Sequence, residues 1–329
     1  MKKELLLQSL LLPCIVFSQQ VYTWKNGAGS WTNPTSWIPN RITPAINDIL
    51  EFNASATIND MPAIENVGRI RVFNNAIVNF SSTISSIVKI GDASVPAPNF
   101  LVESGSTLNI SGTNDISISI LSGYGGTVNG KIQVAGGAHH LLSADASSLI
   151  FQNGSTFSTG SGFTGNPFGT TALNSVVFQS GASYENKGGS NPFGATQPNT
   201  VVNFLWGSNY FQQTATSMSL VGRTYGNVEI DANNTFNIPF NTDCIIQNNL
   251  RLNGFNFSFT PSSGTGALRI GGDLICTGSA NLILGGAGSS NSVILQGTNQ
   301  FLGSGGGTGS ITIQNLTTNN LQTTLQKSV

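Results

Sequence analysis

The sequence predicts an all-β protein, a right-handed parallel β-helix (solenoid) with a tryptophan-rich cap at its N-terminal end. Three observations support this fold: a strand-and-turn pattern that recurs throughout the chain, alternation of apolar residues within short runs, and a scarcity of charge. Charged residues make up 8% of the 329 residues, and 39 residues are glycine. No apolar pattern with a 3.6-residue period persists through any copy, which excludes helical repeats.

The first 18 residues are expected to be a signal peptide. A basic start precedes an apolar stretch from Leu5 to Phe17, which is too short to span a membrane. We expect cleavage near Ser18 and export of the mature chain. A lipoprotein signal is the alternative, with Cys14 as the lipidated residue, but Pro13 stands where a small residue is expected. No later apolar run is long enough for a transmembrane segment.

Residues 19–84 are expected to form the cap segment, because they fit the repeat poorly. Trp24, Trp31 and Trp37 lie close together here. A solenoid needs a cap on its first coil, since an open sheet edge would pair with another chain. The alternative interpretation is an aromatic platform for sugars, which makes Trp24, Trp31 and Trp37 weak candidates for glycan contact.

Residues 85–329 are expected to form about ten β-helix coils. The central pattern is apolar, any, apolar, two of any, Gly, two of any, apolar. Its copies are Phe100, Val102, Gly105, Leu108; Leu149, Phe151, Gly154, Phe157; Val176, Phe178, Gly181, Tyr184; Val202, Phe204, Gly207, Tyr210; and Val228, Ile230, Asn233, Phe236. The positions of the glycine, or of Asn233, are separated by 49, 27, 26 and 26 residues. The first interval therefore predicts one degenerate copy, for which Ile132-Gln133-Val134 with Gly137 is the candidate.

Equal positions in successive coils are expected to stack about 4.8 Å apart. One inward ladder would contain Val102, Phe151, Phe178, Phe204 and Ile230. A second would contain Leu108, Phe157, Tyr184, Tyr210 and Phe236.

The C-terminal part repeats more tightly and predicts the state of the two remaining cysteines. Leu250 to Gly254 matches Leu274 to Gly278 at a spacing of 24 residues. In this register Cys244 matches Leu268, and Cys276 matches Leu252. Both cysteines are therefore expected to be buried core residues in different ladders. A disulfide between them, which an exported chain permits, is the alternative.

Charge and composition exclude several classes of function. A net charge of -1 gives no basic surface for nucleic acid or for an anionic membrane. His139 and His140 are adjacent on an expected strand, so they point to opposite faces and cannot share one metal ion. We expect no metal site and no cofactor.

Acid–base chemistry has one weak candidate group. Glu229 and Asp231 lie on one face of an expected strand, with Arg223 nearby in sequence. Asp243 and Asp273 could align with them on neighbouring coils. A solvated outer face is the favoured interpretation of these residues, so no catalytic residue is assigned.

The opening Trp24-Lys25-Asn26-Gly27, Trp31, Trp37 and Asn47-Asp48 resembles the start of large secreted surface proteins of Bacteroidetes. The phrases at residues 225–230, 270–274 and 297–303 are similar to strands of their bodies. This resemblance implies an adhesin-like β-helix exported by type IX secretion. Such proteins usually end in a sorting domain, whereas this chain stops at Val329 within another expected coil, so we expect a partial chain.

The sequence thus favours a secreted, non-catalytic β-solenoid at the bacterial cell surface, acting in adhesion or as a stalk. Its expected partners are extracellular glycans or other cell surfaces. The alternative is a carbohydrate-active β-helix enzyme, either a polysaccharide lyase or a glycoside hydrolase, since the same fold hosts both.

Overall fold

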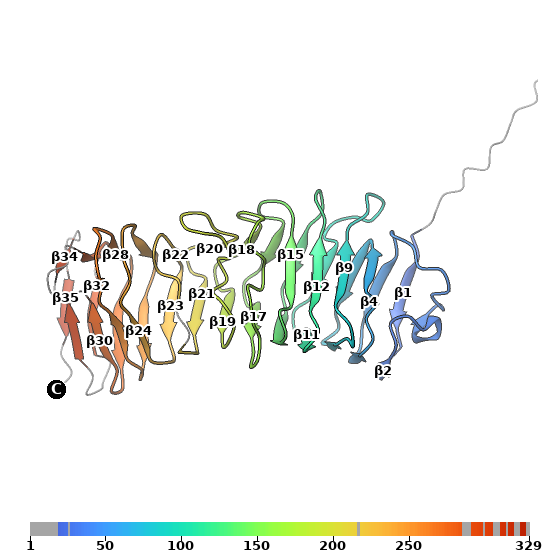
Figure 1. The fold of residues 1–329 in the computed structure, drawn as a ribbon, viewed down its shortest axis with the longest axis horizontal. Helices are drawn as coiled ribbons and strands as arrows, with labels where there is room; N and C mark the ends of the chain where they lie inside the picture. Colours follow the sequence, from blue (N-terminus) through green and yellow to red (C-terminus); the bar gives the residue numbers. More distant parts are fainter. Residues whose placement is uncertain are drawn as a thin grey trace, which may run out of the picture.

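The computed structural model describes residues 19–25, 27–215, 218–284, 291–298, 300–304, 310–313, 315–318 and 323–326. In this part the chain forms an elongated parallel β-solenoid of about eleven turns, with its first and last strands at opposite ends (Figure 1). A short 3-10 turn, η1 (Pro34–Ser36), is the one helical element in these ranges. The predicted signal peptide, with its cleavage near Ser18, and the end of the chain at Val329 lie outside the described residues.

Each coil contributes strands to two or three sides of the solenoid. The first side holds a nine-stranded sheet and then a five-stranded sheet. The nine strands are β3 (Trp37–Ile38), β1 (Val21–Trp24), β4 (Ile49–Phe52), β7 (Arg69–Val72), β10 (Phe100–Val102), β13 (Gly126–Val128), β16 (Leu149–Phe151), β18 (Val176–Phe178) and β20 (Val202–Phe204). The five strands are β22 (Thr224–Tyr225), β25 (Cys244–Ile246), β28 (Ala267–Ile270), β31 (Ser292–Leu295) and β34 (Leu316–Thr318).

The second side carries one sheet of 13 strands that runs along the whole described solenoid. Its strands are β2 (Gly27–Gly29), β5 (Ala56–Ile58), β8 (Ile77–Phe80), β11 (Thr107–Gly112), β14 (Lys131–Gly136), β17 (Thr156–Thr159), β19 (Ser183–Asn186), β21 (Asn209–Gln212), β23 (Asn227–Ile230), β26 (Leu250–Asn253), β29 (Leu274–Thr277), β32 (Gln300–Ser304) and β35 (Thr323–Gln326). Neighbouring strands pair in parallel, as expected of coils that stack in one direction.

The third side holds two four-stranded sheets separated by loops. The first sheet comprises β6 (Ile64–Val67), β9 (Ser86–Ile90), β12 (Ile116–Ile120) and β15 (His140–Ser143). The second comprises β24 (Asn234–Phe236), β27 (Phe257–Phe259), β30 (Asn281–Leu284) and β33 (Ser310–Ile313). In the three coils between β15 and β24 the third strand is replaced by loops, at 160–175, at 187–201 and after β21.

Polar side chains enter the core where these loops replace strands. Thr159, Asn186 and Gln212 stack at an inward position that Val134 and Ile230 occupy in neighbouring coils. Thr159 Oγ1 accepts a hydrogen bond from the backbone N–H of Lys187 at 3.0 Å. Asn186 Nδ2 donates to Gln212 Oε1 at 3.0 Å, and Gln212 Nε2 donates to the carbonyl oxygen of Thr214 at 2.8 Å. These core side chains thus form hydrogen bonds with backbone groups of the loops, which have no neighbouring strand to pair with on this side.

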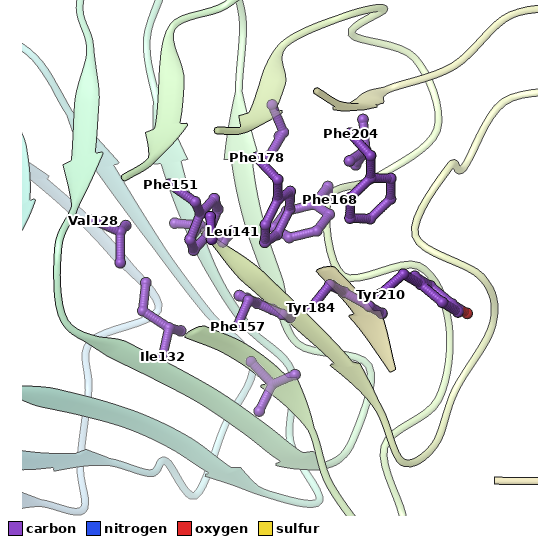
Figure 2. Packing of buried hydrophobic residues seen from close by; sticks show 14 of the residues in the cluster. Val128, Ile132, Leu141, Phe151, Phe157, Phe168, Phe178, Tyr184, Phe204 and Tyr210 are labelled. Atoms are coloured by element: carbon purple, nitrogen blue, oxygen red, sulfur yellow. The ribbon is translucent and has the colours of Figure 1, made fainter. Parts of the chain in front are cut away.

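The predicted ring stacks are confirmed, and Figure 2 shows them in the core. The rings of Phe151 and Phe178 are parallel, with centroids 4.4 Å apart, and Phe204 continues the stack at 5.0 Å. The second stack of Phe157, Tyr184 and Tyr210 has centroid separations of 5.8 and 5.5 Å. Burial of such rings in register is the main term that stabilises these coils.

The predicted register is wrong at two places where a turn changes length. Strand β13 stacks on β10, so Val128 pairs with Val102, and Ile132 pairs with Leu108. The degenerate copy is therefore Gly126 to Val128, because the turn that follows it is shorter than in the other copies.

The second error concerns the fifth copy of the pattern. Val228 pairs with Tyr210, and Ile230 pairs with Gln212, so Ile230 does not belong to the Phe178 ladder. Phe236 lies in β24 on the third side and pairs with Phe259. Tyr225 takes the expected place above Phe204, with ring centroids 5.9 Å apart.

The C-terminal register is confirmed together with the state of the cysteines. Cys244 pairs with Leu268, and Cys276 pairs with Leu252. Both thiols are free and buried. Each cysteine fills the space that leucine fills in the adjacent coil, which is the packing role expected of a buried free thiol.

The cap is built from the predicted tryptophans, but the coils begin earlier than residue 85. Strand β4 already pairs in parallel with β1 and β7, so the predicted boundary after residue 84 is too late. In the turn between β7 and β8, Asn74 and Asn75 adopt φ angles of 59° and 58°. Elsewhere the repeat uses glycine in this turn. This substitution concealed the early coils from the sequence pattern.

Candidate functional site

The three tryptophans proposed as glycan contacts lie inside the cap. Trp24, Trp31 and Trp37 are 3%, 1% and 0% exposed, and Trp37 makes edge-to-face contacts with the other two rings. Their rings therefore offer no face to a sugar, and the structure places them in the core of the first coil.

A buried ion cluster fixes the cap beside these rings. The Arg41 guanidinium bonds Asp48 at 2.8 Å and Glu65 at 3.2 Å. Glu65 also accepts a hydrogen bond from Trp31 Nε1 at 2.9 Å. Because every charge in this cluster has a partner of opposite sign, the cluster offers no free charge to a ligand.

The 13-stranded sheet is the longest sheet of the described solenoid, and we call its outer surface the long face. Its central row contains Thr57, Asn79, Asn109, Gln133, Ser158, Glu185, Phe211, Glu229, Arg251 and Ile275, each paired with the next. Successive amides bond one another, as Asn109 Nδ2 does with Asn79 Oδ1 at 2.8 Å. From Thr57 to Gln133 the row presents hydroxyl and amide groups at the regular spacing of the coils. Ser158 is buried, and the rest of the row, from Glu185 to Ile275, carries charged and apolar side chains.

A hollow of about 240 Å³ lies on the long face, and we call it the central hollow. Residues of β21, β23 and β26 line it, together with Ile275 of β29. Its floor and rim include Phe211, Glu229, Arg251 and the amides of Asn209, Asn227 and Asn249. Asn227 Nδ2 donates to Asn209 Oδ1 at 3.2 Å, which holds two of the amides in place. The central hollow thus combines an apolar ring, amides and one charge of each sign.

The acid of the central hollow has a perturbed protonation equilibrium. Partial burial raises the pKa of Glu229, and the nearby Asp231 carboxylate raises it further, while Arg251 opposes both. Arg251 is exposed and forms no ion pair within 4.0 Å in the described part of the chain. Asp231 is itself bonded by the side-chain amides of Gln213 and Asn253, each at 3.2 Å.

The remaining acid–base candidates lie apart from Glu229. Arg223 is buried, donating to the carbonyl oxygens of Asn199 and Ala195 at 2.5 and 2.6 Å. Asp243 is paired with Arg269 at 2.5 Å. Asp273 accepts the backbone N–H of Phe301 at 2.8 Å at a strand start. These three residues bond structural partners and do not line the central hollow, so neither the nearness of Arg223 in sequence nor the suggested alignment of Asp243 and Asp273 brings them into a site with Glu229.

The two histidines differ in burial: His140 begins β15 and is half-buried, whereas His139 lies just before the strand, which corrects the expectation that both belong to one strand. His139 is fully buried: its Nδ1 accepts from the backbone N–H of Ile116 at 3.1 Å, and its Nε2 lies 3.0 Å from the carbonyl oxygen of Ala135. This pattern identifies a neutral ring with the proton on Nε2. Burial lowers the pKa of both His139 and His140. Within the described ranges, no three His, Cys, Asp or Glu residues are grouped to hold a metal ion.

Trp206 is the functional candidate that the sequence interpretation missed. Its side chain is 67% exposed, whereas the other three tryptophans are buried. It lies in the turn between β20 and β21, directly before Asn209 and Phe211 of the central hollow. The signal was present in the repeat, because the equivalent turns carry Ser104, Asn153 and Ser180 at this position. A tryptophan in a turn that is otherwise polar marks an exposed ring.

Comparison with known proteins gives no match to a family model, to a curated protein or to a solved structure. Among the described residues, no helix has the length and hydropathy needed to cross a membrane.

Proposed function

We propose that this protein is a secreted, non-catalytic β-solenoid of the bacterial cell surface that acts in adhesion or as a stalk and contacts extracellular glycans. The observation that carries the proposal is the long face, a single sheet of 13 strands whose central row carries polar side chains from Thr57 to Glu185. The first and third sides are each divided into two sheets, so neither offers a surface of comparable continuity.

The chemistry of the long face suits sugars better than charged polymers. Asn, Gln, Ser and Thr side chains both donate and accept hydrogen bonds, as sugar hydroxyls do. They bind without ionising, which agrees with a chain that has 8% charged residues. Phe211 supplies a partly exposed apolar ring in the central hollow, against which the C–H face of a sugar ring can pack.

The resemblance to large secreted Bacteroidetes surface proteins supports the proposed location and a type IX export route. A direct test is the N-terminal sequence of the protein recovered from culture medium. A mature chain that begins near Gln19 supports the proposal, whereas a lipidated Cys14 at the new N-terminus replaces secretion with membrane anchoring.

A carbohydrate-active enzyme is the second candidate, and one observation favours it. Glu229, with its raised pKa, stands beside Arg251 in the central hollow. A carboxyl group whose pKa is raised by burial is one feature that general acid catalysis of glycoside cleavage can use.

A glycan array run beside a reducing-end assay on the same secreted protein separates the two candidates. The proposal predicts binding without turnover, with or without calcium. Turnover that is lost in Glu229→Gln, but retained in Glu185→Gln on the same row, would establish the enzyme instead. Glu185 is a matched control because it is paired with Lys187 at 2.6 Å outside the central hollow.

A further inference from the structure

One corner of the solenoid is recessed, next to the central hollow. Strands β22 and β23 are joined by the single residue Gly226, whereas β20 and β21 are joined by a longer turn. Any side chain at Gly226 would collide with the carbonyl oxygens of Leu205 and Ser208. The chain at Gly226 therefore passes directly against the turn that carries Trp206, and only glycine permits this approach.

The Trp206 turn is held rigidly over this corner. Asn248, from the coil beyond Gly226, accepts a hydrogen bond from the backbone N–H of Gly207 through Oδ1 at 2.7 Å. Ser208 Oγ donates to the carbonyl oxygen of Leu205 at 2.6 Å, which closes the turn. Gly207 adopts a φ angle of 80°, which favours glycine. An exposed ring on a turn fixed from both sides loses little conformational freedom when it binds a ligand.

A second hollow, of about 270 Å³, lies on the other side of the same turn, and we call it the corner hollow. It forms where β20 ends the nine-stranded sheet and β22 begins the next one. Its lining includes Thr200, Asn203, Leu205, Thr224 and Gln247. The Oε1 atom of Gln247 is buried and accepts no hydrogen bond within the described residues.

The turn that carries Trp206 therefore lies between the two hollows. Leu205, the residue before it, lines the corner hollow, and Asn209, three residues after it, lines the central hollow. From the next coil, Gln247 lines the corner hollow, and Asn249 lines the central hollow. The recess at Gly226 is thus bordered by amides of both hollows, and the turn beside it carries the exposed Trp206.

The charges around the recess favour an uncharged ligand. Arg223 is the one charged residue that lines the corner hollow, and its guanidinium is committed to backbone carbonyls and to the Phe193 ring, 4.8 Å away. The central hollow is lined by one acidic residue, Glu229, and one basic residue, Arg251, so it carries no net charge when both are ionised. An acidic polymer would meet the Glu229 and Asp231 carboxylates without gaining a second cation.

We propose that a neutral glycan crosses the solenoid at this recess. One sugar ring packs on Trp206, and the sugars on either side of that ring lie in the corner hollow and in the central hollow. This inference rests on the proposed glycan-binding function and names both the class of sugar and the place where it binds. The glycan lies across the coils, not along the sheet axis. Amide groups of Asn203 and Gln247 meet hydroxyls on one side of the ring, and Asn209 and Asn249 meet them on the other.

Intrinsic fluorescence provides the test, because Trp206 is the exposed member of the four tryptophans. The protein is titrated with cellohexaose and mannohexaose as neutral probes and with hexagalacturonate as the acidic probe. Binding of a neutral probe should shift or quench the emission, and calorimetry on the same samples should give the affinity. Trp206→Ala should weaken binding by on the order of tenfold or more, as for a central aromatic contact. Trp206→Phe should retain most of the affinity while losing the fluorescence change.

Phe255→Ala is the matched control, since Phe255 is also an exposed aromatic on a turn, 38% exposed, and lies outside both hollows. It should bind as the wild type does, and thermal melts should show all three variants folded. Unchanged affinity in folded Trp206→Ala, or tighter binding of hexagalacturonate than of the neutral probes, would overturn the recess as the site while leaving glycan binding intact. Failure of the wild type to bind any glycan on the array would overturn the proposed function, and this inference with it.

Discussion

Replacing Phe178 by alanine removes an interior ring of the aromatic stack Phe151, Phe178, Phe204 and Tyr225. Phe178 lies between Phe151, at 4.4 Å with an interplanar angle of 1°, and Phe204, at 5.0 Å. It also meets Tyr184 edge-on at 5.9 Å. A buried Phe→Ala change costs about 3–5 kcal/mol through lost burial and the cavity left behind. We expect a loss in that range, since rings on both sides and tight coils restrict collapse.

Phe178→Leu separates the stacking contribution from simple burial. Leucine keeps most of the buried volume, but it removes two stacked ring contacts. Each contact contributes about 0.5–1.5 kcal/mol in addition to the burial of apolar area. The expected loss is therefore about 1–3 kcal/mol. The measurement is urea unfolding combined with hydrogen exchange in β16, β18 and β20, because solenoids can unfold locally. A Phe178→Ala loss below about 1 kcal/mol, or a Phe178→Leu variant as stable as the wild type, would refute the stacking argument.

Three further predictions concern burial, pH and backbone approach. Cys244 and Cys276 should resist thiol reagents in the folded protein, since burial raises the pKa of Cys244 well above its ordinary value and that of Cys276 to about 11; reaction of either within minutes would contradict their burial. Burial lowers the pKa of His139 in the folded state, so the unfolded chain binds its proton more tightly, and stability should fall as pH drops below about 6.5. Comparing urea midpoints at pH 7.5 and 5 in the wild type and His139→Asn tests this, because the variant should lose part of the difference. Gly226→Ala should destabilise by about 1–3 kcal/mol through the clash with Leu205 and Ser208, and a wild-type melting temperature would show that the corner is looser than described.

The sequence predicts this fold well where repeat length is constant. Phe151, Phe178 and Phe204 share a position set by a glycine turn of fixed length, so their stacking follows from spacing alone. The prediction fails at Ile132 and Ile230 because nearby turns shorten, and pattern matching assumed a constant interval. Nothing in a single interval shows whether residues were lost from a strand or from a turn.

The candidate site was harder to predict because its parts come from different coils. The clustered cap tryptophans suggested a platform, but adjacent large rings near a chain end pack against one another when they can be buried. Trp206 stood alone in sequence, and its exposure follows from the turn geometry around Gly207 and Asn248. The bond from Asn248 joins residues two coils apart, a contact that the 24- to 27-residue period does not indicate.

Hydrogen exchange with and without a bound neutral hexasaccharide tests the central claim most directly. If a neutral glycan binds at the recess, exchange should slow at residues 203–211 and 245–251, the segments that border Trp206 and the two hollows. The cap at residues 19–48 should exchange at the same rate in both states, because its tryptophans are already buried. Protection confined to the cap, or saturating binding with no change in these two segments, would contradict the account.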